Sequence, residues 1–179
     1  KNGIKMSKSK GNVVSPDDLV RDYGCDSLRM YELFVGPPEL DAEWDDRGID
    51  GVYRFLNRVW NLVMDSKDKD IQPTKEMIKI RNKMVYDITN RLESFSLNTV
   101  ISGFMEYNNK LIEIAKKAGG IDKETLSTLS VLLAPFAPHI VMAADAAEFR
   151  ICRKRSLHMA WKVNLRNHSD AFAGSVVDD

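Results

Sequence analysis

The chain has 179 residues, of which 44% are hydrophobic and 29% charged, and its basic and acidic side chains balance to no net charge. This length and apolar content suffice for one domain with a hydrophobic core plus a short appendage. Zero net charge excludes a global attraction to nucleic acid, so any RNA contact depends on local basic patches. No apolar run approaches the roughly 20 residues of a membrane span. The two cysteines, Cys25 and Cys152, lie far apart and predict reduced thiols of a cytoplasmic protein.

The first predicted element is a lysine-rich loop with the sequence Lys-Met-Ser-Lys-Ser-Lys-Gly-Asn at residues 5–12. Lysine ammonium groups supply point charges for phosphate oxygens, serine hydroxyls supply neutral donors, and Gly11 lets the backbone turn. The pattern therefore predicts a mobile loop that closes over a polyphosphate. A solvated lysine loop without a ligand is the alternative interpretation.

Two short helices are predicted after this loop. Ser15-Pro16-Asp17-Asp18 is typical of a helix start, and Gly24 of a helix end. We expect Asp26 to cap the second helix, which should end at Gly36-Pro37-Pro38. Residues 37–47 are too polar and proline-rich for a regular element and predict a connector.

Four longer helices are predicted from about residue 46 onward, because apolar side chains recur there at helical spacing. Loops or breaks are expected at 66–73, 93–96, 119–120 and 135–138. Helices of this length with short connections favour an antiparallel helical bundle, so the fold class is mainly α. The inward-facing side chains are expected to be Val52, Phe55, Leu56, Val59, Trp60, Val63, Met77, Ile80, Met84, Ile88, Leu92, Leu97, Val100, Ile101, Phe104, Met105, Leu111, Ile112, Ala115, Leu126, Leu129, Leu132 and Leu133.

The lysine-rich loop also carries a family resemblance. Residues 5–9 match, letter for letter, the KMSKS loop of class I aminoacyl-tRNA synthetases, and residues 12–29 resemble the run that follows it in the enzymes for leucine, isoleucine and valine. Residues 37–44 resemble a stretch of bacterial-type leucyl-tRNA synthetases at which the valyl and isoleucyl enzymes diverge. Residues 54–60 and 133–139 resemble the two ends of the helical anticodon-binding domain. The resemblance covers about residues 1–140.

The resemblance implies a part of a leucine–tRNA ligase, an enzyme that activates leucine with ATP and charges tRNA(Leu). It implies that Lys5, Met6, Ser7, Lys8 and Ser9 bind ATP and that Lys8 is catalytic, stabilising the charge of the departing pyrophosphate. Mg²⁺ would accompany ATP in the whole enzyme, but no bound metal is predicted because the sequence holds no cluster with metal-ligand spacing. The implied partners are tRNA(Leu), ATP and leucine, for a cytoplasmic monomer without membrane contact.

The chain lacks the first signature of these enzymes and their nucleotide-binding fold, so we expect it to be a portion of a longer protein and inactive alone. The alternatives are a valyl- or isoleucyl-tRNA synthetase fragment, or a purely tRNA-binding or structural helical module. Basic side chains on the predicted helices are interpreted, as a group, as a stripe that contacts the tRNA backbone; each one singly also fits an ordinary charged helix face. They are Arg54, Arg58, Lys79, Arg81, Lys83, Arg91, Lys110, Lys116 and Lys117.

Three regions are expected along the chain. Residues 1–45 form the small α-rich appendage with the KMSKS loop and a segment like the stem-contact region of these enzymes. Residues 46–150 form the anticodon-binding bundle, and residues 151–179 form a divergent, poorly ordered tail. After His139 the sequence departs from the family pattern, which either true divergence or a shifted reading frame would explain.

Overall fold

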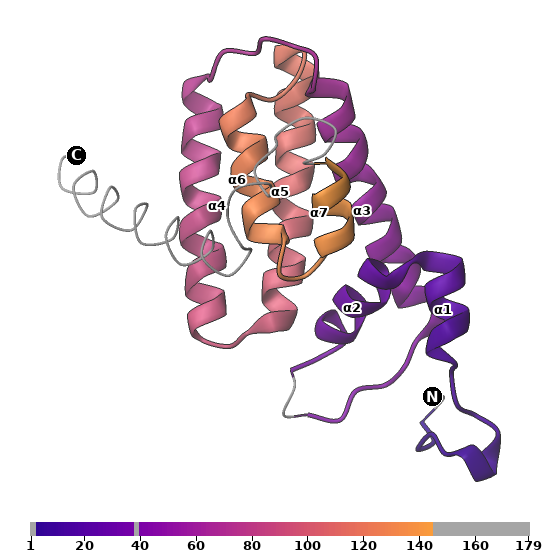
Figure 1. The fold of residues 1–179 in the computed structure, drawn as a ribbon. Coiled ribbons are helices and arrows are strands. Elements are labelled where there is room, and N and C mark those ends of the chain that lie inside the picture. Colours follow the sequence, from indigo (N-terminus) through magenta and orange to yellow (C-terminus); the bar gives the residue numbers. More distant parts are fainter. Residues whose placement is uncertain (1–2, 38–39, 145–179) are drawn as a thin grey trace.

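The computed structural model describes residues 3–37 and 40–144. Within these ranges the chain forms helices and no β-strand, which confirms the mainly α prediction (Figure 1). The tail prediction for residues 151–179 lies outside the described residues. The elements are a 3₁₀ turn η1 (Lys8–Lys10) and the helices α1 (Pro16–Tyr23), α2 (Cys25–Phe34), α3 (Asp46–Ser66), α4 (Lys75–Glu93), α5 (Leu97–Ala118), α6 (Lys123–Leu133) and α7 (Pro138–Ala144).

Helices α3, α4, α5 and α6 run side by side along one long bundle, and α7 folds back beside α3 and α6 (Figure 1). The helices α1 and α2 and the N-terminal loop lie at one end of this bundle. The core is built from the predicted apolar stripes, with Phe55, Met84, Phe104 and Leu126 buried from four different helices. The antiparallel bundle is therefore confirmed.

Local hydrogen bonds fix where the bundle helices begin. The Thr74 hydroxyl accepts a hydrogen bond from the backbone N–H of Met77 at 3.2 Å and starts α4. A carboxylate oxygen of Asp122 accepts from the backbone N–H of Thr125 at 3.0 Å and starts α6. Each side chain satisfies one of the amide groups that lack a partner at a helix N-terminus. Both helices begin just after loops that the sequence predicts, at 66–73 and 119–120.

The turn between α4 and α5 ends the first helix with a non-glycine residue in the left-handed region. The N–H of Ser96 donates to the carbonyl of Arg91 at 2.9 Å, and that of Phe95 to the carbonyl of Leu92 at 3.0 Å. This is the Schellman pattern, in which glycine usually takes the position that Phe95 holds with φ +55°. The turn directs α5 back along α4.

The prediction that Asp26 caps α2 is wrong. Gly24 occupies the position before α2, and Asp26 lies inside the first turn, buried against the bundle. Its carboxylate accepts the backbone N–H of Ile140 at 2.8 Å and contacts Nδ1 of His139 at 2.7 Å. Gly24 both ends α1 and precedes α2, and the Asp26 carboxylate binds one of the free amide groups at the start of α7. It caps a helix more than 100 residues away in sequence.

Candidate nucleotide-phosphate loop and basic helix faces

The lysine-rich loop is a short turn with a tight exit. The N–H of Lys10 donates to the carbonyl of Ser7 at 3.1 Å, and that of Gly11 to the carbonyl of Lys8 at 3.2 Å. Gly11 leaves the turn in the left-handed region, with φ +63°, which glycine adopts without a steric penalty. The sequence prediction of a backbone turn at Gly11 is confirmed.

Asn12 closes the loop from its far side. Its Oδ1 accepts the backbone N–H of Ser7 at 2.8 Å, and its Nδ2 donates to the carbonyl of Lys5 at 3.3 Å. The hydroxyls of Ser7 and Ser9 lie 3.2 Å apart. A side-chain amide that bonds two backbone groups holds the ends of the loop together and leaves the lysine side chains free to project.

The three lysines of the loop are exposed, and none forms an ion pair with a residue in the described part of the chain. Met6 is also exposed, at 40%, and so is not packed into the core. The loop thus presents an unpaired cluster of positive charge, with no acidic side chain within it. Such a cluster suits an anion with several oxygens, such as a polyphosphate.

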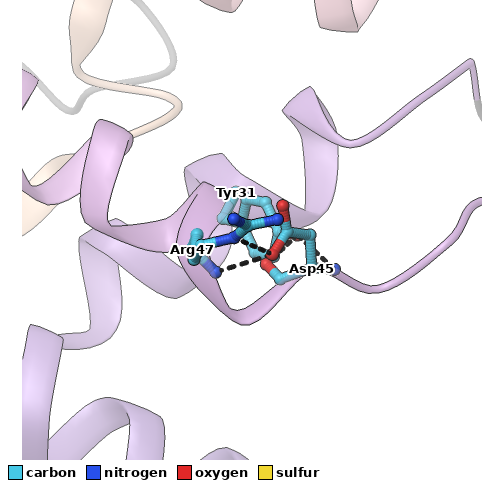
Figure 2. A network of polar contacts seen from close by, with 3 residues as sticks. All are labelled: Tyr31, Asp45 and Arg47. Carbon is cyan, nitrogen blue, oxygen red and sulfur yellow. Dashed lines mark hydrogen bonds and ion pairs between the residues drawn. The ribbon is translucent and has the colours of Figure 1, made fainter. Parts of the chain in front are cut away.

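A compact junction joins the loop-bearing appendage to the bundle. The buried Tyr31 of α2 donates its hydroxyl to the carbonyl of Asp45 at 2.7 Å and accepts the N–H of Asp45 at 3.1 Å. Oδ1 of Asp45 in turn accepts the N–H of Arg47 at 3.0 Å (Figure 2). The Trp44 ring packs edge-on against Tyr31, with centroids 4.9 Å apart. Because Asp45 lies 14 residues away in sequence, no local pattern around Tyr31 reveals this role.

Two family models match the chain. The model of class I tRNA synthetases for isoleucine, leucine, methionine and valine matches residues 1–45. The model described as the anticodon-binding domain of tRNA ligase matches residues 74–171, more than half of the chain, and reaches further than the resemblance to residue 140 described above.

Similar proteins indicate which amino acid's synthetases the chain resembles. Leucine–tRNA ligases of Phocaeicola vulgatus and Fervidobacterium nodosum are 49% and 45% identical over 75% and 78% of this chain. The crystal structure of the Agrobacterium radiobacter K84 agnB2 LeuRS in a ternary complex with tRNA and LeuAMS superposes with a TM-score of 0.71 and 31% identity, over 81% of this chain. The chain belongs to the leucyl-tRNA synthetase family. It spans 14% and 19% of the two ligases and 21% of the solved chain.

Two of the basic residues expected to face tRNA do not lie on such a surface, which corrects the sequence interpretation. Arg81 is buried between helices, where its Nη1 lies 2.7 Å from a carboxylate oxygen of Glu124 and 3.9 Å from one of Asp122. Arg91 is half-buried and donates from Nη1 to the carbonyl of Thr99 at 2.6 Å. In this synthetase segment both guanidinium groups hold helices together.

The other seven basic side chains of that set are exposed on α3, α4 and α5. Among residues 3–37 and 40–144, no group of three or more His, Cys, Asp or Glu side chains converges as metal ligands do. No helix in the same ranges combines the length and apolarity needed to cross a membrane. Together with the lysine loop, these seven side chains give the described synthetase segment two exposed basic features.

Proposed function

We propose that the chain is the part of a leucine–tRNA ligase that supplies the ATP-phosphate loop and a tRNA-binding helical bundle. The observation that carries this proposal is the KMSKS loop, whose lysines project unpaired while Asn12 fixes their backbone. Membership in the leucyl-tRNA synthetase family supplies leucine and tRNA(Leu) as substrates. The expected division into residues 1–45, 46–150 and 151–179 is part of the same proposal.

Within the loop we assign ATP binding to Lys5, Met6, Ser7, Lys8 and Ser9, and the catalytic role to Lys8. In leucine activation a carboxylate oxygen of leucine attacks the α-phosphorus of ATP, and the bond to the departing pyrophosphate breaks. Negative charge builds up on the leaving group. An ammonium group delivered by an exposed loop stabilises that charge in the transition state. The serine hydroxyls offer neutral donors to the same oxygens.

The remaining partners are those expected for the whole leucine–tRNA ligase. Mg²⁺ accompanies ATP, and Lys8 and Lys5 would share the neutralisation of the phosphates with it. The bundle binds tRNA(Leu), as the synthetase in the solved ternary complex is described with tRNA. We propose a monomer that works in the cytoplasm.

Amino-acid-dependent exchange between ATP and pyrophosphate tests the proposal. The full-length protein that contains this chain should catalyse exchange with leucine, and far more slowly with isoleucine or valine. Exchange that prefers isoleucine or valine would replace leucine as the substrate, and no exchange with any amino acid would refute the synthetase assignment. The isolated chain should show no exchange with leucine, because the other half of the active site is not encoded in it; robust exchange would contradict this.

A further inference from the structure

A second basic surface, separate from the KMSKS loop, is a groove between α4 and α5. The groove has a volume of about 230 Å³. Lysines line both of its sides: Lys79 and Lys83 from α4, and Lys110 and Lys117 from α5. Only Glu76 and Glu113 contribute acidic groups to the lining, so the groove carries an excess of positive charge in a chain with no net charge.

The four lysines of the groove have no ion-pair partners in the described part of the chain, although two glutamates line the same groove. Lys110 instead holds its Nζ 5.2 Å from the centre of the Tyr107 ring. Cations that face each other across a concave surface without carboxylate partners repel one another and raise the local affinity for an anion.

The floor of the groove is the buried Tyr107 ring, which offers no stacking surface. Tyr107 is 2% exposed, and its hydroxyl donates to a carboxylate oxygen of Asp87 on α4. Its ring is therefore covered and fixed, and cannot stack on a nucleic-acid base as an exposed aromatic ring does. The accessible groups are ammonium groups on flexible stems, which suit phosphate oxygens and do not read base edges.

The spacing of the lysines suits an extended polyanion better than a single ion. Lys79 and Lys83 lie one helical turn apart on α4, a rise of about 6 Å, and Lys110 and Lys117 lie two turns apart on α5, about 10 Å. Charges distributed in this way follow a chain of phosphates. A folded protein partner with an apolar anchor fits less well, because Ile80 and Ile114 in the lining are half-buried and buried.

We infer that the α4–α5 groove binds the sugar-phosphate backbone of tRNA, through contacts from Lys79, Lys83, Lys110 and Lys117 that do not depend on base sequence. This inference rests on the proposed function, which makes tRNA the partner of the bundle. It goes further by assigning the contact to one groove and by removing Arg81 and Arg91 from the RNA-binding set.

Lys116 and Lys117 provide a matched pair for the test. They are neighbours near the end of α5 and both are exposed, but only Lys117 lines the groove. Lys117→Gln and Lys116→Gln remove the same charge from nearly the same place. In the full-length protein, the tRNA dissociation constant is measured from about 50 to 200 mM salt, where each lost phosphate contact reduces the slope of log affinity against log salt by about 0.7–0.9.

We expect Lys117→Gln to reduce the slope of log affinity against log salt by about 0.7–0.9, and Lys116→Gln to have the slope of the wild type. The variant that combines Lys79→Gln, Lys83→Gln, Lys110→Gln and Lys117→Gln should show this slope reduced by about 3 in total. Cognate and non-cognate tRNA should lose affinity in the same proportion. Equal slopes for Lys116→Gln and Lys117→Gln would overturn the groove assignment, and a loss confined to tRNA(Leu) would overturn the claim of sequence-independent contact.

Further outcomes distinguish a failure of the groove assignment from a failure of the proposed function, and tRNA from an acidic polypeptide as the ligand of the groove. Wild-type protein that exchanges pyrophosphate with leucine and binds tRNA, with groove variants that bind equally well, refutes the groove alone. Wild-type protein that neither exchanges nor binds refutes both. Competition by poly-glutamate as effective as that by tRNA at equal charge would identify an acidic polypeptide as the occupant and overturn the RNA assignment.

Discussion

The junction between the loop-bearing appendage and the bundle depends on a close approach at Gly48, near the start of α3. A Cβ atom added at Gly48 would lie closer than 3.0 Å to two ring carbons and the hydroxyl oxygen of Tyr31. Tyr31 is buried, and its hydroxyl is held by both backbone groups of Asp45, so the ring cannot move aside without losing these bonds. Gly51, one turn further along α3, has no atom within 4 Å of an added Cβ and serves as the control.

The expected change in the free energy of unfolding is the balance of a gain in helix propensity and a loss of packing and hydrogen bonds. Alanine in place of glycine in a helix stabilises by about 0.5–1 kcal/mol. Forcing one extra carbon into a packed site costs about 1–3 kcal/mol, and a displaced Tyr31 hydroxyl loses bonds worth about 1 kcal/mol each. Gly48→Ala should therefore lower the free energy of unfolding by about 2–4 kcal/mol, whereas Gly51→Ala should raise it by up to about 1 kcal/mol.

Urea unfolding followed by circular dichroism measures both variants against the wild type. The changes in the free energy of unfolding should have opposite signs. In thermal unfolding, the melting temperatures of the two variants should differ by on the order of 10 °C for a domain of this size. A Gly48→Ala variant as stable as Gly51→Ala would show that the Tyr31–Asp45 junction is not closely packed.

Two further predictions concern other polar contacts. Asp26→Ala removes a buried carboxylate that accepts the N–H of Ile140, so urea unfolding should show a loss of about 2–3 kcal/mol, whereas a similar loss for exposed Asp22→Ala would contradict this reading. Burial and the hydrogen bond to Asp87 raise the pKa of Tyr107 above its ordinary value of 10.0. Because the unfolded chain releases this proton first, the contribution of Tyr107 to stability is complete below a pH of about 10 and declines above it. The destabilisation by Tyr107→Phe should therefore be smaller at about pH 11 than at about pH 8, and equal destabilisation at the two pH values would refute the assignment.

The helices were predictable because their apolar spacing and their caps are local signals. Thr74 and Asp122 lie three and four residues before the first apolar side chains of their helices, Met77 and Leu126, and both cap a helix start. The inward position of Arg81 was also readable, since it lies four residues after Met77 and three before Met84, on the apolar stripe of α4. Its charge favours a surface position when the helix is considered alone. The partner that permits burial, Glu124, comes from another helix and has no signature in the sequence near Arg81.

Long-range pairings were not predictable for the same reason. The contact of Asp26 with the start of α7 joins residues 114 positions apart, so no local pattern announces it. The α4–α5 groove also exists only once the two helices are packed together, because its lysines are separated in sequence by the turn at Phe95. The KMSKS loop differs, since its residues are contiguous and Asn12 closes it within the same segment.

The most direct test of the central claim is leucine-dependent ATP–pyrophosphate exchange by the full-length protein with Lys8→Ala, compared with Lys75→Ala at the exposed start of α4. The account predicts that Lys8→Ala lowers kcat by about 100- to 1000-fold, as the loss of one transition-state charge contact does. The melting temperature should not change, because the Lys8 side chain is exposed and has no ion-pair partner among the described residues. Exchange by Lys8→Ala at the rate of Lys75→Ala would contradict the assignment of the loop as the phosphate-binding element.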